Sequence, residues 1–300
     1  MLLLTVVYNS SMECIIDEIK DIKKCFEHKK MILGIVESII DDTHFIKFFC
    51  GDDNLSYSSI KTFNLNVANM LYKIVTMEFC KKEMNNFLAE TYFFLPYEEI
   101  KRIKPKIQEA LLSEGAISGP SMVYCINRKN IIMDKITKCI EENNEINISG
   151  FLTFRTKELR ADLECIVDKV VEEYMVEKEY NEFIKLLKYF VEVQESKVDE
   201  LNILIEKNGD YYLKDEDGND LVGNMQMELP KVQFDLKENK EELIISTMIT
   251  TAPKKIIIHC VENCKNKELI QTISKVFENK VYYCDECAVC EKIKKGIEVW

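Results

Sequence analysis

The pattern of hydrophobic and polar positions begins with short apolar runs and one helical stripe. The runs at residues 2–8, 32–39 and 44–49 predict strands, and apolar residues recurring at helical spacing up to Glu27 predict a helix after the first run. This order of elements predicts a small N-terminal α/β unit of β-α-β-β type over residues 1–55.

The pattern over residues 56–195 predicts a large central helical region. Residues 56–88 predict one or two helices, and Tyr97–Glu114 predicts another. Pro105 should kink or split that helix, because proline lacks the backbone donor and its ring clashes with the preceding turn. A further helix is expected from Met122 to about Glu142.

The longest uninterrupted segment has no glycine or proline between Gly150 and Gly209. Apolar residues recur at helical spacing from 159 to 191, which predicts one long amphipathic helix, or two stacked helices broken near 177–179. The opposite face is charged, and such a face is typical of a solvated surface.

The last region, residues 196–300, returns to strands. Asn208-Gly209 between two apolar runs predicts a hairpin with a type I′ turn. An apolar strand at Lys255–His259, a helix at about 267–278 and a short strand at 281–283 predict a β-α-β segment. Together, the three regions predict an α+β fold and can form one compact unit.

Composition narrows the class of protein. The chain has 300 residues, 47% of them hydrophobic, and its formal net charge of -12 repels nucleic-acid phosphates and anionic lipids. The apolar run at 2–8 is too short to span a bilayer, and no other stretch approaches about twenty uncharged residues. We therefore expect a cytoplasmic protein without a membrane span or general nucleic-acid binding, whose cysteines are thiols.

The central segment contains Gly150-Phe-Leu-Thr-Phe-Arg-Thr-Lys-Glu-Leu-Arg160 and continues from Val176 to Gln194. This segment resembles the signature of the YtxC-like sporulation proteins of endospore-forming Firmicutes, and the resemblance extends through the hairpin to Ala252–His259. The resemblance implies a protein linked to spore formation. It assigns no catalytic residue and no biochemical activity.

A cluster of cysteines near the end of the chain has spacing suited to a definite chemistry. Parallel strands joined by a helix end at the same sheet edge, so the residues that follow the strands at 255–259 and 281–283 should meet there. Thiolates gathered in this way suit tetrahedral zinc or an iron–sulfur cluster. His259 is not expected among the ligands, because alternation along the strand directs it to the face opposite its neighbour. The candidate ligands are Cys260, Cys264, Cys284, Cys287 and Cys290.

Two other interpretations of this cluster remain open. The run Cys284-Asp-Glu-Cys287-Ala-Val-Cys290 is only half of a standard zinc motif, because no second CxxC or HxxxH pair accompanies it. The cysteines can therefore be reduced thiols without metal, or Cys284 and Cys287 can form a redox pair.

A second candidate site is basic. Arg155, Lys157 and Arg160 lie at the start of the long segment beside Phe151 and Phe154, a mixture that can contact nucleic acid or phosphate. The alternative is that the phenylalanines pack in the core while the cations pair with nearby carboxylates. Those carboxylates are Glu158, Asp162 and Glu164.

Enzyme signatures are absent from the sequence, which has no glycine-rich phosphate loop and no G-x-S-x-G motif. The leading hypothesis is a non-enzymatic sporulation protein that acts through an unknown protein partner. The alternatives are a zinc or iron–sulfur redox or metal protein that uses the cysteine cluster, and a nucleic-acid-binding regulator that uses the basic residues.

Overall fold

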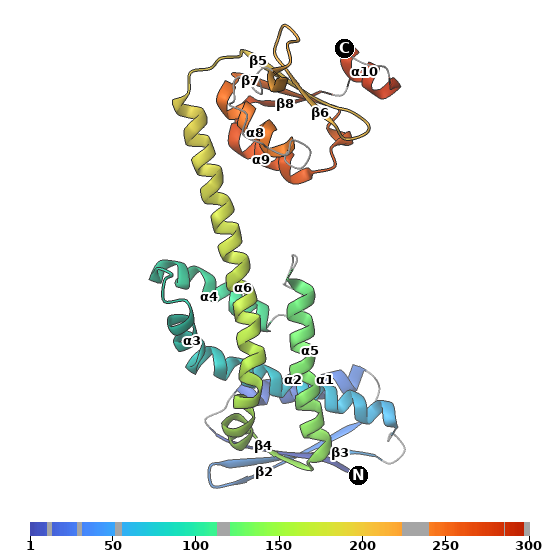
Figure 1. Ribbon diagram of the computed structural model, residues 1–300. Coiled ribbons are helices and arrows are strands. Elements are labelled where there is room, and N and C mark those ends of the chain that lie inside the picture. The colour runs from blue at the N-terminus through green and yellow to red at the C-terminus, as the bar shows by residue number, and fades with distance from the viewer. Residues whose placement is uncertain are drawn as a thin grey trace. The chain divides into compact units, whose positions relative to one another are not determined.

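The computed structural model describes residues 1–10, 14–28, 32–51, 56–112, 121–223, 240–284 and 286–296. The chain divides into two compact units, Met1–Val176 and Glu177–Trp300, and each contains a four-stranded sheet (Figure 1). The predicted α+β class is confirmed. The division into three regions at residues 55 and 195 stays a prediction.

The sheet of the first unit has the strand order β2-β3-β1-β4. The central strand β1 pairs antiparallel with β3 and parallel with β4, and its residues from Leu4 to Tyr8 are buried. Asp41 adopts a left-handed conformation (φ 53°) in the short turn between β2 and β3. The strands are β1 (Leu2–Asn9), β2 (Leu33–Ile40), β3 (Thr43–Cys50) and β4 (Glu145–Asn147).

Helices cover this sheet on one side, as Figure 1 shows. Their apolar faces join the sheet in one core that includes Phe48, Phe63 and Leu71. Ser56 caps α2, because its hydroxyl accepts a hydrogen bond from the Ser59 N–H at 3.1 Å. The helices are α1 (Cys14–His28), α2 (Tyr57–Lys82), α3 (Met84–Thr91), α4 (Tyr97–Leu112) and α5 (Met122–Glu142).

Helix α4 is not split at Pro105, in contrast to one of the two outcomes predicted for it. Lys101 and Pro105 both lie on the exposed side of α4. The carbonyl of Lys101 loses its helical donor to the proline, but at an exposed position water can replace that donor. The helix therefore continues while its other side, including Ile103 and Ile107, stays buried.

Helix α6 (Ile148–Val193) is a single helix of 46 residues, so the first of the two outcomes predicted for this segment is found and the alternative break near 177–179 does not occur. Its earlier part packs in the core of the first unit through residues such as Leu163. Its last part packs in the core of the second unit through residues such as Leu187. The absence of glycine and proline from its last 43 residues explains why the helix is continuous.

The sheet of the second unit has the strand order β6-β5-β7-β8. The pairs β5/β7 and β7/β8 are parallel, and the second of them is the pairing that the predicted β-α-β segment requires. Gly209, with φ 88°, makes the left-handed turn of the β5/β6 hairpin. The strands are β5 (Glu200–Ile205), β6 (Tyr211–Lys214), β7 (Lys255–His259) and β8 (Val281–Cys284).

The two faces of this sheet are covered by different helices. Leu201, Ile203 and Ile205 of β5 point into a core shared with α8 (Lys240–Thr251), α9 (Lys267–Phe277) and the end of α6. Leu204, which alternates with them, packs instead against α10 (Ala288–Lys295). Among the described residues, every helix is too short or too polar to cross a bilayer.

Candidate metal centre

The site lies at the edge of the second sheet where β7 and β8 end. His259 and Cys284 are paired in register across these parallel strands, so their side chains point to the same face. The Cys260 N–H donates to the Cys284 carbonyl at 3.1 Å and holds the two strand ends together. This face is the one that α10 covers.

Helix α10 brings two further cysteines to this edge. Cys287 is the N-cap residue of α10, and its Sγ accepts a hydrogen bond from the Cys290 N–H at 3.4 Å. Cys290 lies in the first turn of the helix and is fully buried against the sheet. The spacing of three residues therefore places both sulfur atoms at the same end of α10.

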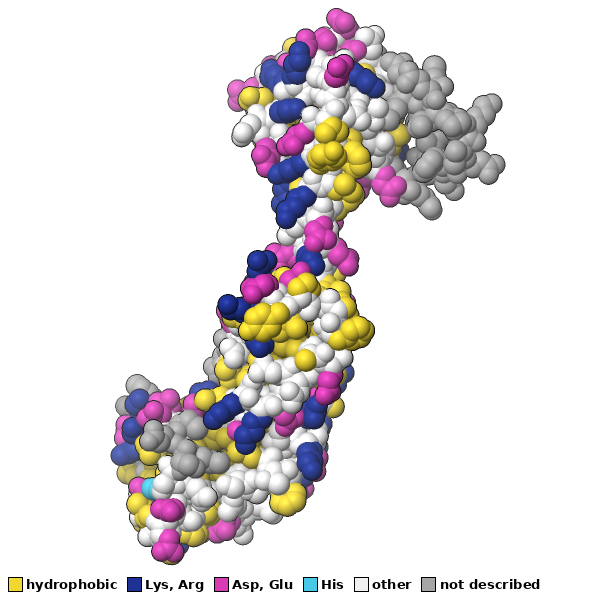
Figure 2. Space-filling model, turned by 90° about the vertical axis from the view of Figure 1, so that its left-hand side faces the viewer, with side chains coloured by type: hydrophobic (Ala, Val, Ile, Leu, Met, Phe, Trp, Pro, Cys, Tyr) yellow, Lys and Arg dark blue, Asp and Glu magenta, His cyan; other side chains and the backbone are white. Residues whose placement is uncertain are grey.

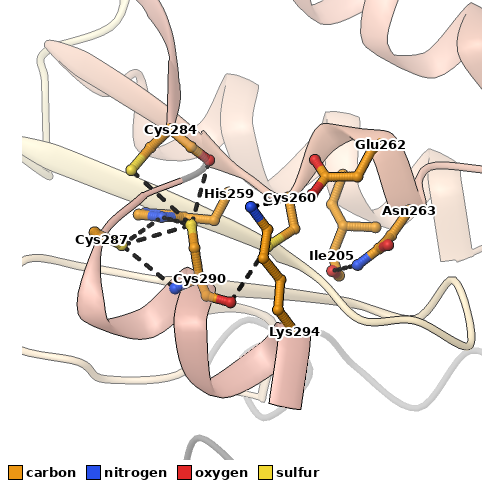
Figure 3. Close-up of polar contacts among 9 residues, drawn as sticks. All are labelled: Ile205, His259, Cys260, Glu262, Asn263, Cys284, Cys287, Cys290 and Lys294. Carbon is orange, nitrogen blue, oxygen red and sulfur yellow. Dashed lines mark hydrogen bonds and ion pairs between the residues drawn. The ribbon is translucent and has the colours of Figure 1, made fainter. Parts of the chain in front are cut away.

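Four side chains converge in this arrangement, as Figure 3 shows. The Nδ1 atom of His259 lies 3.4 Å from Sγ of Cys287 and 3.4 Å from Sγ of Cys290. The Cys290 sulfur lies 3.6 Å from that of Cys287 and 4.0 Å from that of Cys284. All four potential ligand atoms lie within 4.8 Å of one another.

These separations suit a single metal ion. Zinc binds thiolate sulfur at about 2.3 Å and imidazole nitrogen at about 2.0–2.1 Å in a tetrahedron, so its ligand atoms lie roughly 3.5–3.8 Å apart. The three measured contacts to Cys290 fall close to that range at 3.4, 3.6 and 4.0 Å. The four side chains can therefore hold a metal ion such as zinc.

The orientation of His259 is set by a neighbour outside the group. Its Nε2 atom lies 3.0 Å from Oδ1 of Asn202, and an amide oxygen only accepts hydrogen bonds. The proton therefore sits on Nε2, and the lone pair of Nδ1 points toward the cysteines. An outer partner of this kind commonly fixes the tautomer of a histidine that binds metal.

The pKa values of three side chains in the group are shifted in different directions. Burial lowers the pKa of His259 and so favours the neutral ring, although Glu200 opposes this. Burial opposes ionisation of Cys287, but hydrogen bonds from the N–H and thiol of Cys290 and from the Cys284 thiol lower its pKa overall. Burial is the main reason that the pKa of Cys290 is raised. A bound cation would favour the thiolate at every position.

The five cysteines predicted from the sequence are only partly brought together. Cys284, Cys287 and Cys290 belong to the group, whereas Cys260 lies beside it, with its Sγ 3.9 Å from the Cys290 carbonyl. Cys264 lies elsewhere, because its Sγ contacts the Tyr211 hydroxyl at 3.2 Å and the Asn266 carbonyl at 3.0 Å.

His259 was not expected in the group. Alternation does direct His259 and Cys260 differently, but α10 packs on the His259 face. Cys260 ends the strand in a left-handed conformation (φ 54°, ψ 50°), which returns its side chain toward the same helix. The register of β7 against β8 pairs His259 with Cys284, and this register could not be predicted from the sequence.

The predicted basic site is mostly paired. Arg155 donates to Glu158 at 2.8 Å, and Arg160 donates to Glu164 at 2.6 Å. Lys157 is exposed and forms no ion pair with any described residue. Phe151 is buried while Phe154 is exposed, and the nearby Asp162 pairs instead with Arg128 and Lys135 of α5.

The fold and the site define an α+β protein with a candidate metal centre of three cysteines and one histidine in its second unit. The chain belongs to the YtxC-like family, whose model matches residues 65–282. The match includes His259 and ends before Cys284, so the cysteine run lies outside it.

One relative, from Bacillus subtilis (strain 168), carries the name Uncharacterized protein YtxC. It is 28% identical over 128 residues, which make up 42% of this chain and 45% of that protein. The chain thus spans about half the length of the curated relative that it matches. No solved structure matches the chain.

Proposed function

We propose that the second unit binds one zinc ion through Nδ1 of His259 and the sulfur atoms of Cys284, Cys287 and Cys290. The observation that carries this proposal is the convergence of the four ligand atoms within 4.8 Å. Four protein ligands complete a tetrahedral shell and leave no position for water or substrate. The proposed ion is therefore structural.

The proposed role of the ion is to fasten α10 to the sheet. Two of the ligands come from the ends of β7 and β8, and the other two are the N-cap residue of α10 and a residue of its first turn. A metal bonded to both elements restricts their separation, and its binding energy adds to the stability of the folded state. Asn202 supports the site by holding the His259 ring.

An iron–sulfur cluster is the alternative cofactor. Such clusters are held mostly by four thiolates, and the structure gathers three thiols and one imidazole. A redox pair is the other alternative. The pair expected from the sequence is Cys284 with Cys287, and the sulfur atoms of Cys287 and Cys290 lie 3.6 Å apart. Zinc is favoured because the histidine is oriented as a ligand, which a disulfide does not need.

The test is the metal content of the full chain purified without chelator. We expect about one equivalent of zinc by mass spectrometry, and a cobalt-substituted protein with the visible spectrum of tetrahedral thiolate ligation. Cys290→Ser should lose the metal, whereas the matched variant Cys264→Ser should keep it, because Cys264 contacts Tyr211 outside the group. Less than about a tenth of an equivalent of zinc or iron, or equal loss in both variants, would overturn the proposal.

We also propose, as the resemblance implies, that the protein acts in sporulation in the cytoplasm through protein contacts. Membership of the YtxC-like family supports the first part. In the described part of the chain, eleven cysteines form no disulfide, as expected in the reducing cytoplasm. Deletion of the gene in its host should lower the yield of heat-resistant spores at least tenfold, and an unchanged yield would contradict this role.

A nucleic-acid-binding role is supported less well. Arg155 and Arg160 are paired with carboxylates, and the chain carries a net charge of -12. Binding to mixed DNA or RNA that weakens with salt and is lost in Arg155→Ala/Arg160→Ala would favour it over the other proposals.

A further inference from the structure

The second unit contains a groove that the proposed metal site does not use. It has a volume of about 520 Å³ and lies between the last part of α6, α8 and α9. Its apolar lining includes Phe183 and Phe190 of α6, Ile245 and Ile249 of α8, and Leu269 of α9. These helices cover the face of the sheet opposite to α10.

The groove walls present regular hydrophobic strips. Phe183, Leu187 and Phe190 stand at positions i, i+4 and i+7, and therefore lie along one side of α6. Leu187 belongs to the core, but Phe183 is 48% exposed and Phe190 is 43% exposed. Figure 2 shows hydrophobic side chains gathered at the surface of this unit. Ile245 and Ile249 form a second strip at i and i+4 on α8. Two such strips suit the packing of a third helix.

The charged residues that line the groove are all acidic. They are Glu241, Glu242 and Glu268. Glu242 and Glu268 are exposed and form no ion pair with any described lysine or arginine. Glu241 accepts a hydrogen bond from the Asn266 side chain. The rim of the groove therefore favours a positively charged occupant and repels phosphate.

From these observations we infer that the groove binds an amphipathic helix of a protein partner, with a hydrophobic stripe flanked by lysine or arginine. Helix α8 has 12 residues, so a partner helix of similar length, about 18 Å, matches the wall. The stripe would cover Phe183 and Phe190, and the basic residues would meet Glu242 and Glu268. This role goes beyond metal binding and does not depend on it.

The probe is a synthetic helical peptide of fourteen residues made only of leucine and lysine, with leucines at i, i+3, i+4 and i+7. Its binding to the full chain is measured by fluorescence anisotropy. A peptide of the same composition in scrambled order tests the hydrophobic stripe, and a leucine–glutamate peptide tests the charge. We expect both to bind at least tenfold more weakly than the probe.

Two variants test the location. Glu242→Lys/Glu268→Lys should weaken binding at least tenfold, and Phe190→Ser should do so independently of charge. The matched control Glu141→Lys/Glu142→Lys makes the same change in net charge at exposed residues of α5 and should leave binding unchanged. Glu242 and Glu268 also lie in the first turns of their helices, which carboxylates stabilise, so thermal melting of each variant is recorded alongside.

Three results would overturn the inference. One is equal binding of the probe and its scrambled form, and another is equal weakening by the control variant, since both indicate attraction by net charge alone. The third is unchanged binding in Phe190→Ser.

Discussion

The two faces of the second sheet are covered in different ways. On one face, α9 has 11 residues and buries Leu269, Ile273, Val276 and Phe277. On the other, α10 has 8 residues and buries only Cys290 and Ile293. Burial of a large apolar side chain stabilises by roughly 1.5–3 kcal/mol, so the first face gains much more from the hydrophobic effect.

This difference indicates what holds α10 in place. An isolated helix shorter than about 12 residues is marginal in water, and most helices in proteins are stabilised by a packed apolar face. Helix α10 has a small apolar face but three cysteines at its start and at the adjacent strand end. We therefore expect one face to be stabilised by apolar packing and the other by a metal ion.

The largest expected effect is the removal of metal. Chelation should increase hydrogen exchange of the backbone amides of α10 by about a hundredfold or more, because structural zinc supplies much of the folding energy of small sites. The amides of α9 should change little, since its contacts are apolar. Exchange measured by mass spectrometry with and without chelator tests this.

The variant Cys264→Ser is the control for this experiment, because it should keep the proposed metal and respond to chelator as the natural chain does. Equal protection of α10 with and without metal would remove the distinction between the two faces.

The second effect concerns the apolar face. Ile273→Ala removes a fully buried side chain of α9, and such changes cost about 2–5 kcal/mol through lost burial and the cavity left behind. Thermal unfolding should show this loss equally with zinc and with chelator. Ile270→Ala, at a partly buried position of the same helix, is the milder comparison. A loss that disappears when metal is removed would mean that the two faces are not independent.

A smaller effect, on metal affinity, is expected when Asn202, the partner of the proposed ligand His259, is replaced. Asn202→Ala removes the acceptor that holds His259 Nε2 at 3.0 Å. Loss of such a partner typically weakens metal affinity by about 10–100-fold. Competition with a zinc indicator measures the change, and Asn208→Ala in the exposed hairpin turn is the matched control. Unchanged affinity in Asn202→Ala would show that the ring is held by its packing alone.

Periodic patterns predicted much of the fold, because long helices and apolar strands have strong local signals. The β5/β6 hairpin and the parallel pair β7/β8 follow from such patterns, and one of the two outcomes predicted for the long segment is the single helix α6. Strand β4 was missed because its 3 residues are too few for a pattern. It is a strand only because it pairs with β1.

The candidate site was predicted in part for a similar reason. Cysteine spacing and strand topology placed Cys284, Cys287 and Cys290 near one edge. The inclusion of His259 depends on which face α10 covers, and the separation of Cys264 depends on its contact with Tyr211. Both are tertiary features with no local signal. The short helix α10 itself was not predicted, because its 8 residues follow a cysteine-rich turn.

The smallest expected effect is the loss of a buried hydrogen bond in the first unit. The stability that this bond supplies is lost at high pH, whereas a zinc site is lost at low pH. The Tyr72 hydroxyl donates to the Leu111 carbonyl at 2.8 Å, near the end of α4. Tyr72→Phe should therefore lower stability at neutral pH by about 1 kcal/mol, the usual net value of such a bond.

Burial raises the pKa of Tyr72 from 10.0 to about 12. Because the folded value is the higher one, the stabilising effect of the neutral phenol is fully present below pH 10.0 and is lost as the pH rises toward 12. A metal held by thiolates is instead released as acid protonates them. Denaturant unfolding from pH 7 to 11 should show a less steep alkaline loss of stability in Tyr72→Phe, with the exposed Tyr57→Phe as control. Parallel pH profiles for the natural chain and Tyr72→Phe would show that this buried phenol does not contribute to the alkaline sensitivity of the first unit.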